Sequence, residues 1–127
     1  MQAPEYVAAA ARRYAETFSA GDRESWLGCL TEDVELIEPA DALPRRGRAV
    51  FAGIFDAVES SGRRITLEPI RIIANGKWAA VHMSVRVLLP DARVMENSVI
   101  EIFEVSDDGH IERIRTFLDG PVSGAHP

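Results

Sequence analysis

The sequence contains almost no cysteine and no long hydrophobic run. Cys29 is the single cysteine among 127 residues, so no disulfide can form within the chain, and a reduced, cytoplasmic setting is expected. No apolar stretch approaches the length of a membrane span, and the first residues lack the apolar core of a signal peptide. We therefore expect neither a membrane protein nor a disulfide-stabilised secreted domain.

Clustered positive charge and metal-binding motifs are also missing. The chain has 14 basic and 20 acidic residues, a formal net charge of −6, and its arginine pairs are isolated from one another. This balance argues against nucleic acid and anionic membranes as partners. The histidines show no metal-ligand spacing, and no glycine-rich phosphate loop is present. The sequence therefore predicts no metal site and no phosphate-binding loop.

Hydrophobic periodicity predicts one α+β domain over residues 1–127. Apolar residues make up 46% of the chain, which is enough for a core with a pocket inside it. Apolar residues recur at helical spacing in three segments, which predicts helices over about 4–20, from Asp22 to about 30, and over about 48–60. Strand-like alternation covers 34–38, 64–73, 78–89, 94–105 and 111–118, and Asn75-Gly76 is a strong hairpin signal. Helices followed by antiparallel strands predict about three helices packed on one concave face of a curved sheet of about five strands. Such a half-cone leaves an apolar hollow between its layers.

Glu38 ends an apolar row in the segment 34–39. Val34, Leu36 and Glu38 share one face of the predicted strand, and Pro39 stops the hydrogen-bond ladder. A carboxylate in this position either looks into a cavity or reaches solvent at the rim of the sheet.

Glu101 and Tyr14 also stand among apolar residues. Val99, Phe103 and Val105 share the face of Glu101, so burial should raise the pKa of this carboxyl group and favour its neutral form. The alternative is an ion pair with Arg115 or an edge position open to water. Tyr14 lies on the apolar stripe of the first helix, where a core tyrosine with an arbitrary partner is the common outcome.

Together, the three side chains suggest a chemistry. Glu38 as an ionised base can remove a proton from the carbon next to a carbonyl, while Tyr14 and neutral Glu101 donate hydrogen bonds to the enolate oxygen. Such donors are usually the largest catalytic contribution, and a positioned base adds to it.

The chain resembles the Δ5-3-ketosteroid isomerases, within the wider NTF2-like (SnoaL-like) superfamily. The residues that carry the resemblance, in the family's order and spacing, are Arg13-Tyr14, Ala20-Gly21-Asp22, Glu32-Asp33-Val34, Glu38-Pro39, Pro44-Arg45, Gly47 and Glu101-Ile102-Phe103. The resemblance implies Glu38 as the proton-shuttling base, with Tyr14 and protonated Glu101 as oxyanion donors, since this family is known to keep a carboxylic acid neutral at pH 7 for that purpose. It also implies a homodimer, no cofactor and an apolar, steroid-like substrate. The substrate-lining positions that it implies are Phe55, Val81, Met83, Val85, Phe103 and Leu118.

The chain departs from the steroid isomerases at its acids. They usually carry Asp at the positions of Glu38 and Glu101, and often Tyr at the position of Phe55. These differences bear on the substrate more than on the acid–base chemistry. Relatives with the same fold are polyketide and polyether cyclases, epoxide hydrolases and non-catalytic ligand-binding proteins, and these stay open as alternatives.

Overall fold

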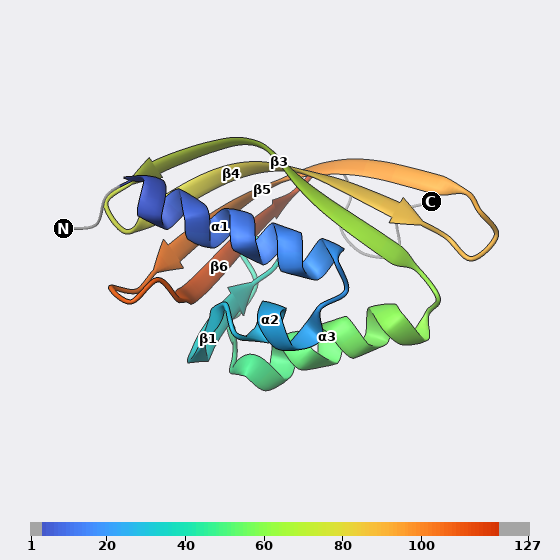
Figure 1. Cartoon of the computed structure of the whole chain (residues 1–127), viewed down its shortest axis with the longest axis horizontal. Helices are drawn as coiled ribbons and strands as arrows, with labels where there is room; N and C mark the ends of the chain where they lie inside the picture. Colours follow the sequence, from blue (N-terminus) through green and yellow to red (C-terminus); the bar gives the residue numbers. More distant parts are fainter. Residues whose placement is uncertain (1–3, 120–127) are drawn as a thin grey trace.

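The structure is a computed structural model, and it describes residues 4–119. Three helices pack on one curved sheet: α1 (Pro4–Ser19), α2 (Arg23–Leu27) and α3 (Arg48–Ser60). Figure 1 shows α1 running along the inner side of the sheet, with α2, α3 and β1 (Leu30–Ile37) on the side of α1 away from β3 and β4. The predicted α+β half-cone is confirmed.

The sheet is open and mixed, with strand order β2-β1-β6-β5-β4-β3. Only the β1–β6 pair is parallel; the other neighbours run antiparallel. The remaining strands are β2 (Arg45–Arg46), β3 (Arg64–Asn75), β4 (Trp78–Leu88), β5 (Val94–Val105) and β6 (Ile111–Leu118). The sixth strand, absent from the prediction, is β2, a two-residue piece within the expected loop before α3.

The second helix is shorter than predicted. Asp22 caps α2 by accepting a hydrogen bond from the backbone N–H of Ser25 at 3.2 Å. The helix ends at Leu27, and Leu30 already belongs to β1, whereas the apolar run suggested a helix to about residue 30. Short apolar runs occur in both helices and strands, and here the pairing of Leu30 with Ile111 of β6 places Leu30 in a strand.

Strand β3 continues through Pro69, as the predicted strand over 64–73 does. The register shifts between Pro69 and Arg71, and β3 is an edge strand of the sheet. Because an edge strand has one unpaired side, a residue without an N–H is tolerated there. The hairpin predicted at Asn75-Gly76 is present, and Gly76 has the positive φ of +61° that such turns require.

The core lies between α1, α2 and the sheet and is rich in aromatic rings. Trp26 of α2 is at its centre, with ring centroids 5.5 Å from Tyr14, 4.8 Å from Phe18, 5.7 Å from Phe51 and 5.8 Å from Phe55. These tilted contacts join all three helices into one layer that faces the strands.

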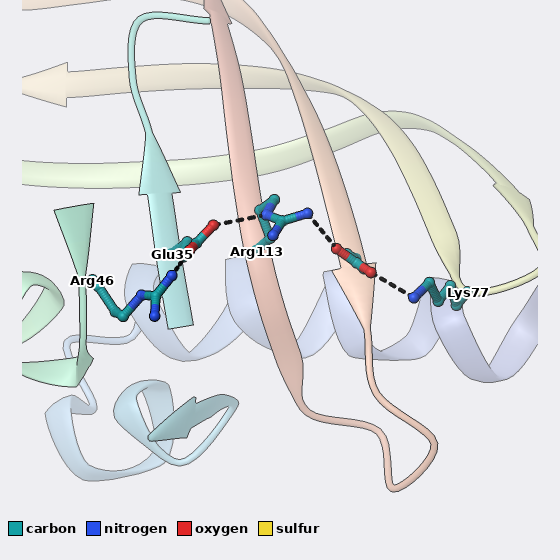
Figure 2. Close-up of polar contacts among 5 residues, drawn as sticks. Glu35, Arg46, Lys77 and Arg113 are labelled. Atoms are coloured by element: carbon teal, nitrogen blue, oxygen red, sulfur yellow. Dashed lines mark hydrogen bonds and ion pairs between the residues drawn. The ribbon is translucent and has the colours of Figure 1, made fainter. Parts of the chain in front are cut away.

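A chain of ion pairs ties the strands together at the end of the sheet near the β3–β4 turn. Figure 2 shows Glu35 of β1 between Arg46 of β2 and Arg113 of β6. Arg113 is 2.9 Å from Glu35 and 3.0 Å from Glu104 of β5, and Lys77 in the β3–β4 turn is 2.6 Å from Glu104. The side chains of Glu35 and Glu104 are only 12% and 9% exposed, so water solvates their carboxylates poorly. The positive charges of this network compensate for that missing solvation.

Candidate functional site

A cavity of about 270 Å³ opens between the helices and the inner face of the sheet. This volume lies just below the range of about 300–1,000 Å³ found for sites that bind drug-sized ligands. Apolar side chains form most of its wall, and Tyr14, Glu38 and Glu101 all line it. The three residues singled out in the sequence therefore border one space, although they come from α1, the end of β1 and β5.

Glu38 lies at the mouth of this cavity. Val34 and Leu36 on the same face of β1 are buried, whereas Glu38 follows the last residue of the strand and is exposed. The Glu38–Pro39 peptide is cis. Both readings of the sequence hold in part: the carboxylate borders the cavity and also reaches solvent.

Glu101 is buried on the inner face of β5 and is 7% exposed. Its Oε2 accepts a hydrogen bond from the Thr116 hydroxyl at 3.3 Å, and its Oε1 is buried with no hydrogen-bond partner within residues 4–119. Burial raises the pKa of Glu101 to about 7, assisted by the charge of Glu38 and opposed by the Thr116 bond. The carboxyl group therefore carries a proton for much of the time at neutral pH.

The alternative ion pair between Glu101 and Arg115 is not formed. Arg115 pairs with Ile102 across the β5–β6 ladder, so its side chain points to the other face of the sheet. Its guanidinium donates to the backbone carbonyl of Ala40.

Tyr14 reaches the cavity from the helical layer. It is 6% exposed, and its ring packs edge-on against Phe103 with centroids 5.3 Å apart. Burial raises the pKa of its phenol well above the ordinary value, and the charges of Glu101 and Glu38 add to this effect. Among the described residues its hydroxyl has no hydrogen-bond partner. The phenol is thus a neutral donor that is free to bind a ligand.

Strand pairing places the two carboxyl groups in one row across the sheet. Thr116 of β6 pairs with Glu101 of β5, and Ile37 of β1 pairs with Arg115, so Glu38 comes next to Thr116. Two strand spacings separate the backbones of Glu38 and Glu101, a span of about 10 Å.

The six predicted lining residues divide into three groups. Val85 and Leu118 line the cavity, whereas Val81, Met83 and Phe103 are fully buried beneath α1 in the core. All five point to the inner face of the sheet, but the helix covers the central part of that face and leaves only its outer part open. Phe55 instead borders a second hollow of about 250 Å³, which shares Phe18 and Ile65 with the cavity.

Two polar lining residues were not anticipated from the sequence: Thr116 and Asn97. Thr116 interrupts the apolar row Ile114–Leu118 of β6, and Asn97 stands on the same face of β5 as Val99 and Glu101. The signal that revealed Glu38, a polar residue in an apolar alternation, was therefore present for Thr116 as well.

Residues 4–119 carry neither a metal-binding cluster nor a membrane-spanning helix. No group of three or more His, Cys, Asp or Glu side chains in this range is arranged to hold a metal ion. None of its helices is long and apolar enough to cross a membrane. Cys29 is buried, and burial raises the pKa of its thiol, as expected for an unreactive core cysteine.

The sequence of residues 11–114 matches the family model of the SnoaL-like domain. The chain belongs to this family, which lies within the NTF2-like superfamily. None of the curated proteins matches the chain in sequence at a significant level.

Solved structures with the same fold include three enzymes. The epoxide hydrolase/cyclase-like enzyme SalBIII, with a role in pyran ring formation in the polyether salinomycin, superposes with a TM-score of 0.82 at 23% identity, covering 93% of this chain and 94% of that one. The Δ5-3-ketosteroid isomerase from Mycobacterium sp. gives 0.78 at 21% identity, covering 90% and 93%. An LEH-like epoxide hydrolase of M. tuberculosis gives 0.79 at 18% identity, covering 91% and 84%. At these identities the likeness establishes the fold, and it leaves the reaction open.

Proposed function

We propose that the protein is a cofactor-independent isomerase that moves a carbon–carbon double bond into conjugation with a ketone in an apolar, steroid-like substrate. The observation that carries this proposal is the common cavity of one exposed carboxylate, Glu38, and two buried neutral donors, Tyr14 and Glu101. Two buried polar groups such as Tyr14 and Glu101 are expensive to maintain in a mostly apolar wall unless a ligand uses them.

The proposed reaction is a proton transfer from carbon to carbon. Glu38 removes a proton from the carbon between the ketone and the double bond, and the electron pair moves onto the ketone oxygen. Tyr14 and Glu101 donate hydrogen bonds to the resulting dienolate oxygen. The protonated Glu38 then returns the proton to the far end of the conjugated system, which forms the conjugated ketone and regenerates the carboxylate.

The test is turnover of a β,γ-unsaturated 3-ketosteroid, followed by the absorbance of the conjugated enone. We expect catalysis by the natural chain and loss of catalysis in Glu38→Gln, which keeps the shape of the side chain but cannot accept the proton. Equal rates for the two proteins would contradict the proposal.

A second candidate reaction, epoxide opening with ring formation, is favoured by the row of two acids. Glu38 takes the proton of an attacking hydroxyl as the new C–O bond forms, the epoxide C–O bond breaks, and Glu101 gives its proton to the epoxide oxygen. A carboxyl group with a pKa of about 7 can act as this acid and be reprotonated at neutral pH. Conversion of a hydroxy-epoxide to a cyclic ether, without steroid turnover, would select this reaction.

The proposal includes a homodimer. Ile100 and Phe117 pair across β5 and β6 and are both exposed, at 40% and 47%, on the face of the sheet opposite the cavity. Exposed apolar neighbours of this kind are typical of interfaces between subunits. Sedimentation equilibrium of the natural chain and of Ile100→Lys tests it: the natural chain should be a dimer and the variant a monomer.

A further inference from the structure

The hydroxyl of Thr116 contacts one oxygen of the Glu101 carboxyl group and leaves the other free. Oγ1 donates to Oε2 at 3.3 Å, and Thr116 is 2% exposed. Oε1 is also buried but has no partner within the described part of the chain. The contact follows from the sheet register, since Thr116 and Glu101 are directly paired residues of β6 and β5.

This asymmetry decides where the proton of the neutral acid resides. A protonated carboxyl group has one oxygen that donates and one that acts as a carbonyl acceptor. Since Oε2 already accepts from Thr116, the proton is favoured on Oε1. Oε1 is then the oxygen that can donate to a ligand in the cavity that Glu101 lines.

We propose that Thr116 is a positioning residue that holds the proton of Glu101 on Oε1 and so sets the direction in which this acid donates. The role of Oε1 toward a substrate rests on the proposed function. The location of the proton depends only on the contact between Thr116 and Glu101, so it can be tested without turnover.

The other groups around Glu101 do not replace this contact. Tyr14 faces it from α1, and Glu38 faces it from the end of β1 and raises its pKa through charge. On β4 the directly paired residue is Val81, which has no polar group. Thr116 is thus the neighbour that hydrogen-bonds to Glu101 among the described residues, and its bond favours the ionised form.

The first experiment is infrared spectroscopy of the protonated carboxyl group near pH 5.5. The C=O stretch of Glu101 is identified by its loss in Glu101→Gln. Thr116→Val, which keeps the side-chain shape but removes the hydroxyl, should move this band to higher wavenumber because the carbonyl loses its hydrogen bond. Thr116→Ser should restore the band position. Thr66→Val, the same change at an exposed position of β3, is the matched control and should leave the band unmoved.

The second experiment measures titration and binding. In Thr116→Val the pH at which Glu101 ionises should rise by roughly one unit, because a hydrogen bond to the ionised form is lost. The affinity for 2-naphthol, a probe that offers one oxygen to the cavity, should fall severalfold, and Thr116→Ser should recover both values. An unchanged band and an unchanged titration midpoint in folded Thr116→Val would overturn the proposal. If the band moves while no ketone is turned over, the positioning role stands and the isomerase proposal fails.

Discussion

Tyr14 and Glu101 reach the same cavity from opposite layers of the fold, Tyr14 from α1 and Glu101 from β5. Each is buried, and burial together with the charge of Glu101 raises the pKa of the Tyr14 phenol. Oε1 of Glu101 has no hydrogen-bond partner within residues 4–119. Two neutral donors that border one space are what the proposed oxyanion site requires.

Tyr14→Phe should lower the activity and leave the stability of the fold nearly unchanged. The substitution removes a donor to the enolate, so kcat should fall by about 10²–10³-fold. The free energy of unfolding should change little, because the lost hydroxyl makes no hydrogen bond among the described residues. Steady-state kinetics and urea unfolding of the same preparations measure both. A large loss of stability would show instead that the hydroxyl holds the core together.

Glu101 should make the protein less stable as the pH rises from about 5 to about 8. The folded carboxyl group has a pKa of about 7 against an ordinary 4.5, so the folded state binds its proton more tightly than the unfolded chain. Stability from this group is therefore complete below pH 4.5 and is lost as the pH rises toward 7, by about 3 kcal/mol in total.

Urea unfolding of the natural chain and of Glu101→Gln at pH 5 and pH 8 measures this dependence. The amide cannot ionise, so the variant should be the more stable of the two at pH 8 and should lose the part of the pH dependence that belongs to Glu101. Parallel pH profiles for the two proteins would show that Glu101 titrates as an ordinary exposed acid.

Much of the fold could be predicted from local patterns. The helix at 48–60 and the strand at 94–105 were expected with the bounds that the structure has, because each is a long segment with one clear period. Pairing with distant strands determines the secondary structure of the shorter segments. Leu30 belongs to β1, and Arg45–Arg46 forms β2 within a segment whose prolines and glycine indicated only a loop.

The sequence could predict which face of the sheet each site residue occupies, but not the shape of the cavity. Alternation placed Glu38, Glu101 and the valines of β4 on the inner side of the sheet. It could not tell that α1 covers Val81 and Met83 and leaves Val85 open, because that depends on where a helix crosses the strands. Thr116 was overlooked because hydroxyl residues are common in strands. A role for Thr116 in the site is indicated by its pairing with Glu101 across the sheet.

Glu38→Asp tests whether the cavity is adapted to the longer acid. The change withdraws the carboxylate by about one ångström, and a displacement of this size costs on the order of 10²-fold in rate when geometry is set for the original side chain. We expect kcat to fall to that extent with KM nearly unchanged, because Glu38 lies at the mouth and not among the apolar contacts. A faster Asp variant would mean that the cavity is built for a different base position.

The ion-pair network of Figure 2 should contribute to stability without affecting the cavity. Arg113→Ala leaves Glu35 and Glu104 without a shared partner, and both are largely buried, so we expect a loss of about 1–2 kcal/mol in unfolding free energy. Arg23→Ala removes a well-aligned but exposed pair with Asp56 and is the matched control, with a much smaller loss expected. Equal losses in the two variants would show that burial of the carboxylates does not matter here.

The central claim is that Tyr14 and neutral Glu101 bind one ligand oxygen together, and calorimetric titration with 2-naphthol tests it most directly. The natural chain should bind 2-naphthol more tightly than 2-methoxynaphthalene, which has no acidic hydrogen and develops no oxyanion. Tyr14→Phe and Glu101→Leu should each weaken 2-naphthol binding by about tenfold or more, and the double variant should lose less than the product of the two effects, since the donors share one acceptor. Unchanged affinity for 2-naphthol in both single variants would contradict the claim.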